Sequence, residues 1–169
     1  MSDATVAVLS LGSNLGDREQ NLREAVAEIG ALDGVTVLAT SPLVETPAIK
    51  PTGVDADAPP YLNAIVTVLT TLPAHDLLTH VNQIEADHGR KREVRWGDRT
   101  LDIDIVAYGD VIQDDPSLTL PHPRAAERSF VLVPWLDLDP DAVLAGIGRI
   151  DALPAAAANV SRYPPEAET

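Results

Sequence analysis

The clearest strand pattern in the chain is Tyr61-Leu-Asn-Ala-Ile-Val-Thr-Val-Leu-Thr-Thr-Leu72. It is rich in β-branched residues, which pack well on the pleated surface of a sheet. Pro73 follows it directly, and proline is favoured at the first position of a helix. Apolar residues then recur at helical spacing up to Gly89. We therefore expect a strand over 61–72 and a helix over 73–89.

On the N-terminal side, residues 5–11 predict a short, largely buried strand. It runs into the turn-rich segment Gly12-Ser-Asn-Leu-Gly16. Asp17 is the expected N-cap of a following helix, which Gly30 or Gly34 closes.

The region between this helix and the strand at 61–72 is rich in proline. Residues 35–41 form a β-rich run that ends at Pro42. From Glu45 to Pro60 the chain holds four prolines and three acids and shows no helical periodicity. We therefore expect a strand over 35–41 and a long loop over 45–60, of the kind that serves as a lid or a binding loop.

The C-terminal half begins with a basic segment at 90–99, after which residues 101–108 predict a buried strand that carries two aspartates. The apolar stretches at 128–138 and 141–147 predict short helices or irregular cover for the core. The last residues, about 156–169, are expected to form a frayed tail.

The order of these elements is β-α-β-β-α-β, with additional pieces at the C-terminal end. It predicts an α+β fold, the ferredoxin-like βαββαβ sandwich, with the helices on one face of a mainly antiparallel sheet. The sequence shows no internal repeat and no sign of a second domain, so residues 1–169 are interpreted as a single domain. This architecture hosts many activities, and the function has to come from particular side chains.

Acidic residues dominate the charge of the chain: 26 Asp and Glu against 12 Lys and Arg give a net charge of −14 and a pI near 4.4. Nucleic acids and anionic membranes select basic surfaces, so neither is an expected partner. Cysteine is absent, which excludes disulfides, thiolate metal sites and cysteine nucleophiles. With no signal-peptide pattern and no apolar run of about 18 residues, the chain is expected to be cytoplasmic.

Two carboxylates, Asp102 and Asp104, are the first candidates for chemistry. They stand at i and i+2 of a predicted strand, so both side chains project from the same face. Leu101, Ile103 and Ile105 then face the core. Neighbouring carboxylates repel each other unless a cation lies between them, and Mg²⁺ takes one or two carboxylates together with substrate phosphates. The pair therefore predicts a magnesium site; a solvated strand face with two acids is the alternative.

Residues 90–99 hold five cations and two acids, a local charge of +3 in an acidic chain. Guanidinium groups bind phosphate oxygens in bidentate fashion. A metal-binding carboxylate pair beside an arginine-rich segment is what phosphoryl transfer from a nucleoside triphosphate requires. Taken alone, the segment is equally consistent with a solvated surface loop.

Another polar cluster follows in the sequence, where Pro121-His122-Pro123-Arg124 precedes Arg128 and Phe130. The histidine is either a ligand contact or structural. Trp96 and Phe130 can stack on a planar heterocycle while Asn63 reads its amide edge. Core packing is the alternative for Phe130.

With these residues the sequence resembles the 6-hydroxymethyl-7,8-dihydropterin pyrophosphokinases, enzymes of the folate pathway. The most specific match is Arg95-Trp-Gly-Asp-Arg-Thr-Leu-Asp-Ile-Asp-Ile105. The other matching segments, in the order of the family, are Leu11-Gly-Ser-Asn-Leu-Gly16, Tyr61-Leu-Asn-Ala64, Leu120-Pro-His-Pro-Arg124 and Glu127-Arg-Ser-Phe-Val-Leu132.

The resemblance implies transfer of the β,γ-pyrophosphoryl group of ATP to the hydroxymethyl oxygen of the pterin, with release of AMP. ATP and 6-hydroxymethyl-7,8-dihydropterin are thus the expected partners. It also implies the ferredoxin-like fold and a monomer, as is usual in the family. Asp102 and Asp104 would be the metal ligands, holding two Mg²⁺ ions that bridge the triphosphate.

The resemblance also assigns individual residues. The catalytic residues would be Arg90, Arg99, Asp102 and Asp104, with the arginines steadying the transferring group. The ATP contacts would be Glu85, Arg92, Trp96, Arg99, His122 and Arg128. The pterin pocket would comprise Thr46, Pro47, Tyr61, Asn63, Trp96 and Phe130. No side chain stands out as a general base, which suits a loose transition state in which positioning and charge neutralisation do most of the catalysis.

Two other interpretations stay open. One is a ferredoxin-like regulatory or RNA-binding domain. An RNA-binding domain of this kind would show aromatic residues on its central strands and a basic face. The strand at 61–72 offers only one aromatic residue, Tyr61. A metal-dependent nucleotidyltransferase or phosphohydrolase would use the same aspartate pair. The nucleotide product decides the class: AMP that forms only with the pterin supports pyrophosphoryl transfer, and ADP rejects it.

Overall fold

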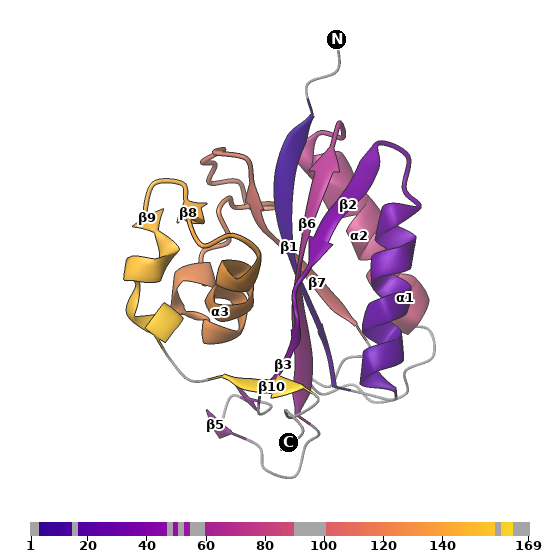
Figure 1. Ribbon diagram of the computed structural model, residues 1–169. Helices are drawn as coiled ribbons and strands as arrows, with labels where there is room; N and C mark the ends of the chain where they lie inside the picture. The colour runs from indigo at the N-terminus through magenta and orange to yellow at the C-terminus, as the bar shows by residue number, and fades with distance from the viewer. Residues whose placement is uncertain are drawn as a thin grey trace.

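A computed structural model describes residues 4–14, 17–46, 49–50, 53–54, 60–89, 101–157 and 160–163. Its centre is a six-stranded antiparallel sheet with helices on both faces (Figure 1). The strand predicted at 61–72 is confirmed as β6 (Tyr61–Thr70), which has neighbours on both sides.

The other strands are arranged around β6. On one side β6 pairs with β1 (Thr5–Ser13), and β1 pairs in turn with the edge strand β7 (Asp102–Tyr108). On the other side β6 pairs along one half with β2 (Val35–Thr40) and along the other half with β3 (Leu43–Thr46). The strand beyond β3 is β10 (Ser161–Tyr163).

Pro42 ends β2, as predicted, and β3 then starts on the same side of β6. Proline has no N–H group to donate to a ladder. Ser41 bridges the interruption, because its Oγ accepts the N–H of Ile65 at 2.8 Å and its own N–H donates to the Ile65 carbonyl at 2.8 Å. The pairing with β6 therefore continues past the proline towards Tyr61.

Helices α1 (Arg18–Gly30) and α2 (Ala74–Gly89) cover one face of the sheet (Figure 1). Asp17 caps α1, as predicted: its carboxylate accepts the N–H of Gln20 at 3.1 Å. The core beneath the two helices takes every second residue of β1 and one face of each helix, including Ala7, Leu9, Leu11, Leu22, Ile29, Leu77 and Val81.

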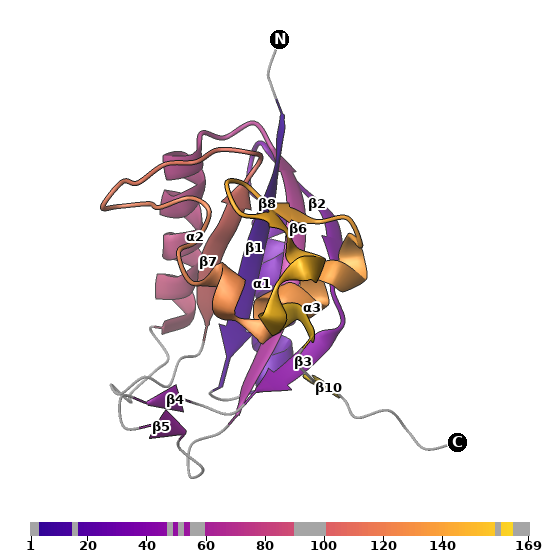
Figure 2. The same ribbon diagram turned by 90° about the vertical axis from the view of Figure 1, so that its left-hand side faces the viewer.

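The expectation that the helices occupy one face of the sheet is incomplete, because α3 (Ser129–Leu138) packs against the opposite face (Figures 1 and 2). Successive residues of a strand point to opposite faces, and the neighbours Val8 and Leu9 of β1 are both buried. A second core joins α3 to this face and includes Val8, Ile65, Val106, Leu132 and Trp135. The sheet thus lies between two helical layers.

Residues 141–147, expected as a short helix or irregular cover for the core, are not helical. Ala142 and Leu144 cover the second core, and part of the segment forms a small hairpin in which β8 (Val143–Leu144) pairs with β9 (Gly148–Arg149). Gly146 and Gly148 have φ angles of +79° and +123°, which L side chains rarely adopt. The chain therefore turns here rather than continuing as a helix. Short 3₁₀ turns flank α3 and the hairpin: η1 (Ala125–Glu127), η2 (Ile150–Ala152) and η3 (Pro154–Ala157).

Two segments expected to be irregular contain paired strands. Part of the expected tail at 156–169 is β10, which pairs with β3, while residues 164–169 lie outside the described residues. In the expected loop at 45–60, β3 extends to Thr46, and β4 (Ile49–Lys50) pairs with β5 (Gly53–Val54) (Figure 2). In both segments the regular structure comes from pairing with another strand. The composition of a segment does not show whether such a partner strand lies beside it.

Within the described ranges, no helix has the length and apolar character needed to cross a membrane; the longest, α2, has 16 residues.

Candidate functional site

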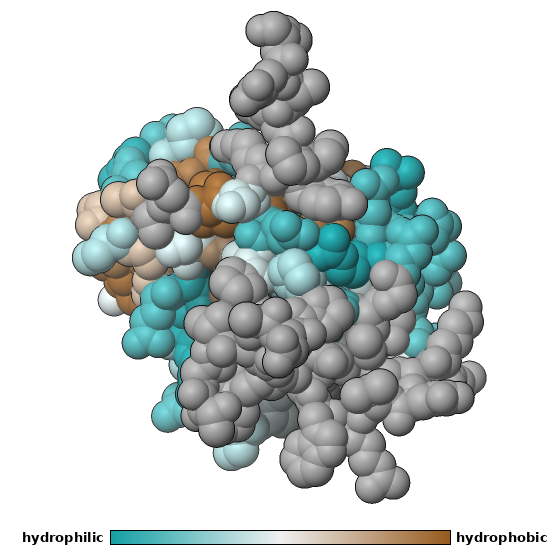
Figure 3. Space-filling model, turned by 90° about the horizontal axis from the view of Figure 1, so that it is seen from below, coloured by the Kyte–Doolittle hydropathy of each residue, from teal (hydrophilic) through white to brown (hydrophobic). Residues whose placement is uncertain are grey.

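The described residues of the predicted site gather at one end of the sheet, where β1 and β3 end and β6 and β7 begin (Figure 1). In the sheet register Asp102 pairs with Gly12 and Asp104 with Ser10. Gly12 pairs on its other side with Asn63. Because directly paired residues share a face, both aspartates and Asn63 project to the same side. Figure 3 views this end from below, where hydrophilic and apolar residues meet near the middle of the described surface.

The prediction that the side chains of β7 alternate between the core and the opposite face of the sheet is confirmed. Ile103 and Ile105 are each 3% exposed and belong to the core beneath α1 and α2. Asp102 and Asp104 are half-buried on the other face, and the Asp104 side chain keeps 45% of its surface exposed.

The two carboxylates fit the chemistry of a bound Mg²⁺. They supply hard oxygen donors from one accessible face, and Mg²⁺ completes its octahedral shell with water and phosphate oxygens. Nowhere in the described segments do three or more His, Asp or Glu side chains stand together as a possible metal site. Among the described residues, Asp102 and Asp104 are the carboxylates on this face that could hold such an ion.

Glu85, assigned by resemblance to ATP binding, contacts the sheet. Its Oε2 accepts the N–H of Ile103 at 2.8 Å. β7 lies at the edge of the sheet, where outward-pointing N–H groups need an acceptor other than a strand. The carboxylate from α2 provides one, and so holds the residue that lies between the two aspartates.

Arg128 and His122 lie beside Asp104. Arg128 Nη1 is 3.7 Å from Asp104 Oδ2, a partly exposed ion pair. Burial lowers the pKa of His122 below its ordinary value, Asp104 opposes that shift, and Arg128 and Arg124 reinforce it. His122 Nδ1 accepts the N–H of Arg124 at 3.2 Å, which assigns the proton of the neutral ring to Nε2. Together Arg128 and His122 place N–H donors near Asp104, as an anionic ligand requires.

Phe130 adjoins this group. The Arg128 guanidinium carbon is 5.6 Å from the centroid of the Phe130 ring, a cation–π contact. The half-buried ring also packs against the second core. Core packing, which the sequence left as an alternative, is therefore present, and part of the ring stays accessible for stacking.

Asn63 is held at the start of β6. Its side-chain amide donates to Thr46 Oγ1 at 2.9 Å, and the residue is 4% exposed. A Cβ placed on Gly12 would lie 3.2 Å from Asn63 Oδ1 and 3.4 Å from the Tyr61 ring. Gly12 thus makes room for both side chains. The sequence interpretation placed Gly12 in a turn, although a glycine inside a strand pattern signals such a close approach.

Apart from Glu85, which contacts β7 from α2 on the other face, the described residues of the predicted site form two groups on one sheet face, linked by the pairings of Gly12 with Asp102 and Asn63. The charged group comprises Asp102, Asp104, His122 and Arg128, with Phe130 beside it. The amide group comprises Thr46, Tyr61 and Asn63. The roles of all the predicted site residues stay predictions. Five of these residues lie outside the described ranges: Pro47, Arg90, Arg92, Trp96 and Arg99.

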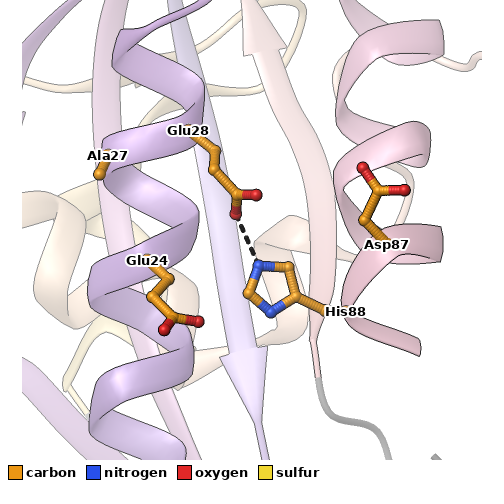
Figure 4. A pocket seen from close by; sticks show the side chains of 5 residues that line it. All are labelled: Glu24, Ala27, Glu28, Asp87 and His88. Atoms are coloured by element: carbon orange, nitrogen blue, oxygen red, sulfur yellow. Dashed lines mark hydrogen bonds and ion pairs between the residues drawn. The ribbon is translucent and has the colours of Figure 1, made fainter. Parts of the chain in front are cut away.

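Two hollows in the surface lie away from these groups. One, of about 340 Å³, is lined by Glu24, Ala27, Glu28, Asp87 and His88 between α1 and α2 (Figure 4). The other, of about 300 Å³, lies between the sheet and α3, with Val8 and Trp135 in its lining. Neither hollow is lined by a predicted site residue.

The model of the family described as 7,8-dihydro-6-hydroxymethylpterin-pyrophosphokinase (HPPK) matches residues 8–140. The chain belongs to the HPPK family. It is thus an enzyme of the pyrophosphokinase type, as predicted, and the matched range contains every described residue of the predicted site.

Relatives of the HPPK family show the same likeness. The 2-amino-4-hydroxy-6-hydroxymethyldihydropteridine pyrophosphokinase of Methylorubrum extorquens is 45% identical over 142 residues, which cover 84% of this chain and 87% of the relative. The Bacillus subtilis protein of the same name is 43% identical over 133 residues, covering 79% and 77%.

Solved structures of HPPK-DHPS proteins resemble the fold. One, in complex with substrates, has a TM-score of 0.65 at 12% identity, over 88% of this chain and 42% of that one. A Plasmodium falciparum structure has a TM-score of 0.67 at 16% identity, over 89% and 45%. At these identities the likeness concerns the fold alone, and the chain spans less than half the length of these proteins.

Proposed function

We propose that this chain transfers the β,γ-pyrophosphoryl group of Mg-bound ATP to the hydroxymethyl oxygen of 6-hydroxymethyl-7,8-dihydropterin, as a step of folate synthesis. The observation that carries the proposal is the pair of groups on one sheet face: carboxylates with cationic donors for a metal triphosphate, next to a buried amide for a heterocycle. The names of relatives support the pathway, since one from Arabidopsis thaliana is a folate synthesis bifunctional protein.

The reaction forms one bond and breaks another at the β-phosphorus. The pterin hydroxymethyl oxygen bonds to this phosphorus, the bond to the oxygen that bridges the α- and β-phosphates breaks, AMP leaves, and the hydroxyl proton passes to solvent. When bound, Mg²⁺ would neutralise the triphosphate and align its oxygens. Asp102 and Asp104 would hold the metal. Arg128 and neutral His122 would donate hydrogen bonds to phosphate oxygens.

The amide group would orient the pterin. Asn63 has one N–H committed to Thr46, which fixes the plane of its amide and leaves the other N–H and Oδ1 to match the donor and acceptor edge of the ring. A fixed ring brings the hydroxymethyl oxygen to the triphosphate. For a loose phosphoryl-transfer transition state, such positioning supplies much of the rate enhancement.

We also infer the ferredoxin-like arrangement, a monomer and a cytoplasmic location. The strand order β7-β1-β6 with β2 next to β6, and the order of α1 and α2 along the chain, support the βαββαβ description. The net charge of −14 supports a protein that does not bind nucleic acid or anionic membranes.

The test is the identity of the nucleotide product when protein, Mg²⁺, ATP and the hydroxymethyl dihydropterin are mixed. We expect AMP and the pterin diphosphate in equal amounts, and no AMP without the pterin. ADP as the product, or hydrolysis of ATP that ignores the pterin, would exclude pyrophosphoryl transfer.

Asp102→Asn and Asp104→Asn test the metal role. Each should lower kcat/KM by about 100-fold or more, because removing a carboxylate removes a charged metal ligand. Asp110→Asn is the matched control, since Asp110 is exposed two residues beyond the end of β7. Full activity in either site variant would contradict the metal assignment.

A further inference from the structure

Arg18, the first residue of α1, contacts two chain segments that meet at the site. Its Nη1 donates to Glu45 Oε2 at 2.8 Å and to the carbonyl oxygen of Pro60 at 2.8 Å. A terminal guanidinium nitrogen carries two N–H groups, so one nitrogen can serve both acceptors. The Arg18 side chain is 20% exposed and that of Glu45 32%. One side chain therefore joins α1, β3 and the residue that precedes β6.

These contacts lie at the open end of a very short ladder. β3 and β6 are joined by three residue pairs, Val44–Asn63, Glu45–Leu62 and Thr46–Tyr61. Glu45 belongs to the middle pair, and Pro60 lies directly beyond the last one. The pairing of β2 and Ser41 with β6 leads into this ladder at one end, whereas no described pair continues it beyond Thr46 and Tyr61. The guanidinium thus ties together the two strands where their pairing ends.

Arg18 stands where local preferences do not favour a cation. The N-terminus of a helix carries a partial positive charge, so acidic residues are preferred in the first turn and basic ones in the last. Asp17 as N-cap and Glu19 follow that preference, whereas Arg18 runs against it. Its tertiary contacts account for the position.

Helix α1, which carries Arg18, is held in place by buried side chains. Leu22, Ala25 and Ile29 of α1 are buried in the first core. Asn21 adds a second link to the site, because its side-chain amide donates to Ser13 Oγ at 3.2 Å at the end of β1. The first turns of α1 therefore hold the ends of β1, β3 and β6 relative to one another.

We propose that Arg18 is a positioning residue for pterin binding: it bridges Glu45 and Pro60 and thereby keeps Thr46 and Tyr61 in register. The Asn63–Thr46 hydrogen bond depends on that register, because Asn63 and Thr46 belong to different pairs of the same ladder. The inference rests on the proposed function, in which Thr46, Tyr61 and Asn63 bind the pterin. Arg18 itself touches neither substrate nor metal in this role.

The experiment compares Arg18→Met, Arg18→Lys and Arg23→Met by titration with the pterin in the presence of Mg²⁺ and a non-hydrolysable ATP analogue, and by steady-state kinetics. Arg18→Met keeps the length of the side chain and removes both hydrogen bonds. It should raise the Kd and KM for the pterin about tenfold, because pterin binding then has to restore the strand register that the two hydrogen bonds held, while the KM for ATP changes less than about twofold.

The control variants separate positioning from a general loss of stability. Lysine has three N–H donors, so Arg18→Lys should recover part of the pterin affinity. Arg23 lies on the same helix, its side chain is 72% exposed, and its described contact is an ion pair with Glu19 within α1, so Arg23→Met should behave as wild type. In an Arg18→Met background, Glu45→Ala should weaken pterin binding no further, because the bridge is already lost.

Three results would overturn the proposal: wild-type pterin affinity in Arg18→Met, equal losses for ATP and pterin, or additive effects of Arg18→Met and Glu45→Ala. Hydrogen exchange of the amides of residues 44–46 and 61–63 provides a readout without substrate, and Arg18→Met should accelerate it relative to Arg23→Met. If the wild type forms no AMP, the proposed function fails; if exchange is also unchanged in Arg18→Met, the bridge fails independently.

Discussion

Gly12 is the residue at which the two groups of the site meet. It pairs with Asp102 on one side and Asn63 on the other. Asn63 and Tyr61 lie close above it, so that a Cβ here would be 3.2 Å from Asn63 Oδ1 and would require the amide to give way. The contribution of Gly12 is therefore steric. Because it has no side chain, the Asn63 amide can lie against β1 on this face of the sheet.

Gly12→Ala should weaken pterin binding several-fold and leave ATP binding unchanged. The added methyl would lie 3.2 Å from Asn63 Oδ1, so the amide has to shift slightly, which strains its hydrogen bond with Thr46. Calorimetric titration with each ligand measures the effect. Gly30→Ala, where the added Cβ would meet Val37 at 3.4 Å, is the control. Equal pterin affinity in both variants would refute the steric role.

The lowered pKa of His122 predicts how the free energy of unfolding depends on pH. Its pKa in the folded protein is lowered, chiefly by burial, from the ordinary value of 6.5 that applies in the unfolded chain. Between the two values the unfolded chain binds more protons, so the free energy of unfolding falls as the pH drops below 6.5.

Replacing His122 by Gln removes this proton uptake. The stability of the wild type relative to His122→Gln should therefore decline from about pH 8 to about pH 5, measured by urea unfolding without nucleotide. The exposed His80 serves as control, and His80→Gln should leave the pH dependence of the wild type in place. A constant difference between wild type and His122→Gln would contradict the lowered pKa.

At the scale of elements, α1 and α2 are joined by a partly buried pair, His88 and Glu28, that lines one of the hollows (Figure 4). His88 Nε2 lies 2.6 Å from Glu28 Oε2, and the His88 side chain is 8% exposed. Replacing His88 by Ala leaves a void and a carboxylate without this partner. The free energy of unfolding should fall by about 1–3 kcal/mol in chemical denaturation, whereas Glu24→Gln at an exposed position in the same hollow should change it little.

β10 also links distant parts of the chain. It adds a strand to β3, whose other neighbour is β6, and Ser161 pairs with Glu45. It lies beyond residue 140, where the match to the family ends.

Deleting residues 158–169 should lower the free energy of unfolding by about 1–3 kcal/mol, the scale of two or three backbone hydrogen bonds. The deletion should also accelerate amide exchange in β3. Deleting only residues 164–169 keeps β10 and serves as the control. If both truncations have the same stability, β10 contributes nothing to β3.

At the scale of the whole molecule, the two cores share the same strands. β1 contributes Leu9 to one core and Val8 to the other, and β6 contributes Leu62 and Ile65 in the same way. Loss of either core exposes the sheet to water, so the two cores should unfold together.

Leu77→Ala in the first core and Leu132→Ala in the second should each cost about 2–4 kcal/mol and shift one common transition. Trp135 reports the second core by fluorescence in a Trp96→Phe background, and circular dichroism reports the whole fold. The two signals should coincide in both variants. Separate transitions would show that the α3 layer folds independently.

Residue spacing along the sequence determined several strands, a helix cap and the shared face of two aspartates, without any tertiary contact. The strands at β1, β6 and β7, the cap at Asp17 and the shared face of Asp102 and Asp104 follow from backbone geometry, because side chains alternate along a strand and capping acts within one turn. The prediction of family and enzyme type followed from short motifs in the same way, and the comparisons confirm it.

Only the tertiary structure decided the contacts between residues far apart in sequence. Arg18 reaches residues 27 and 42 positions away, and Glu85 reaches Ile103 at a separation of 18. The α3 layer and the pairing of β10 with β3 are also of this kind. Such contacts depend on strand register and on which faces pack together, and those are set by the balance of the whole fold rather than by the residues on either side of a position.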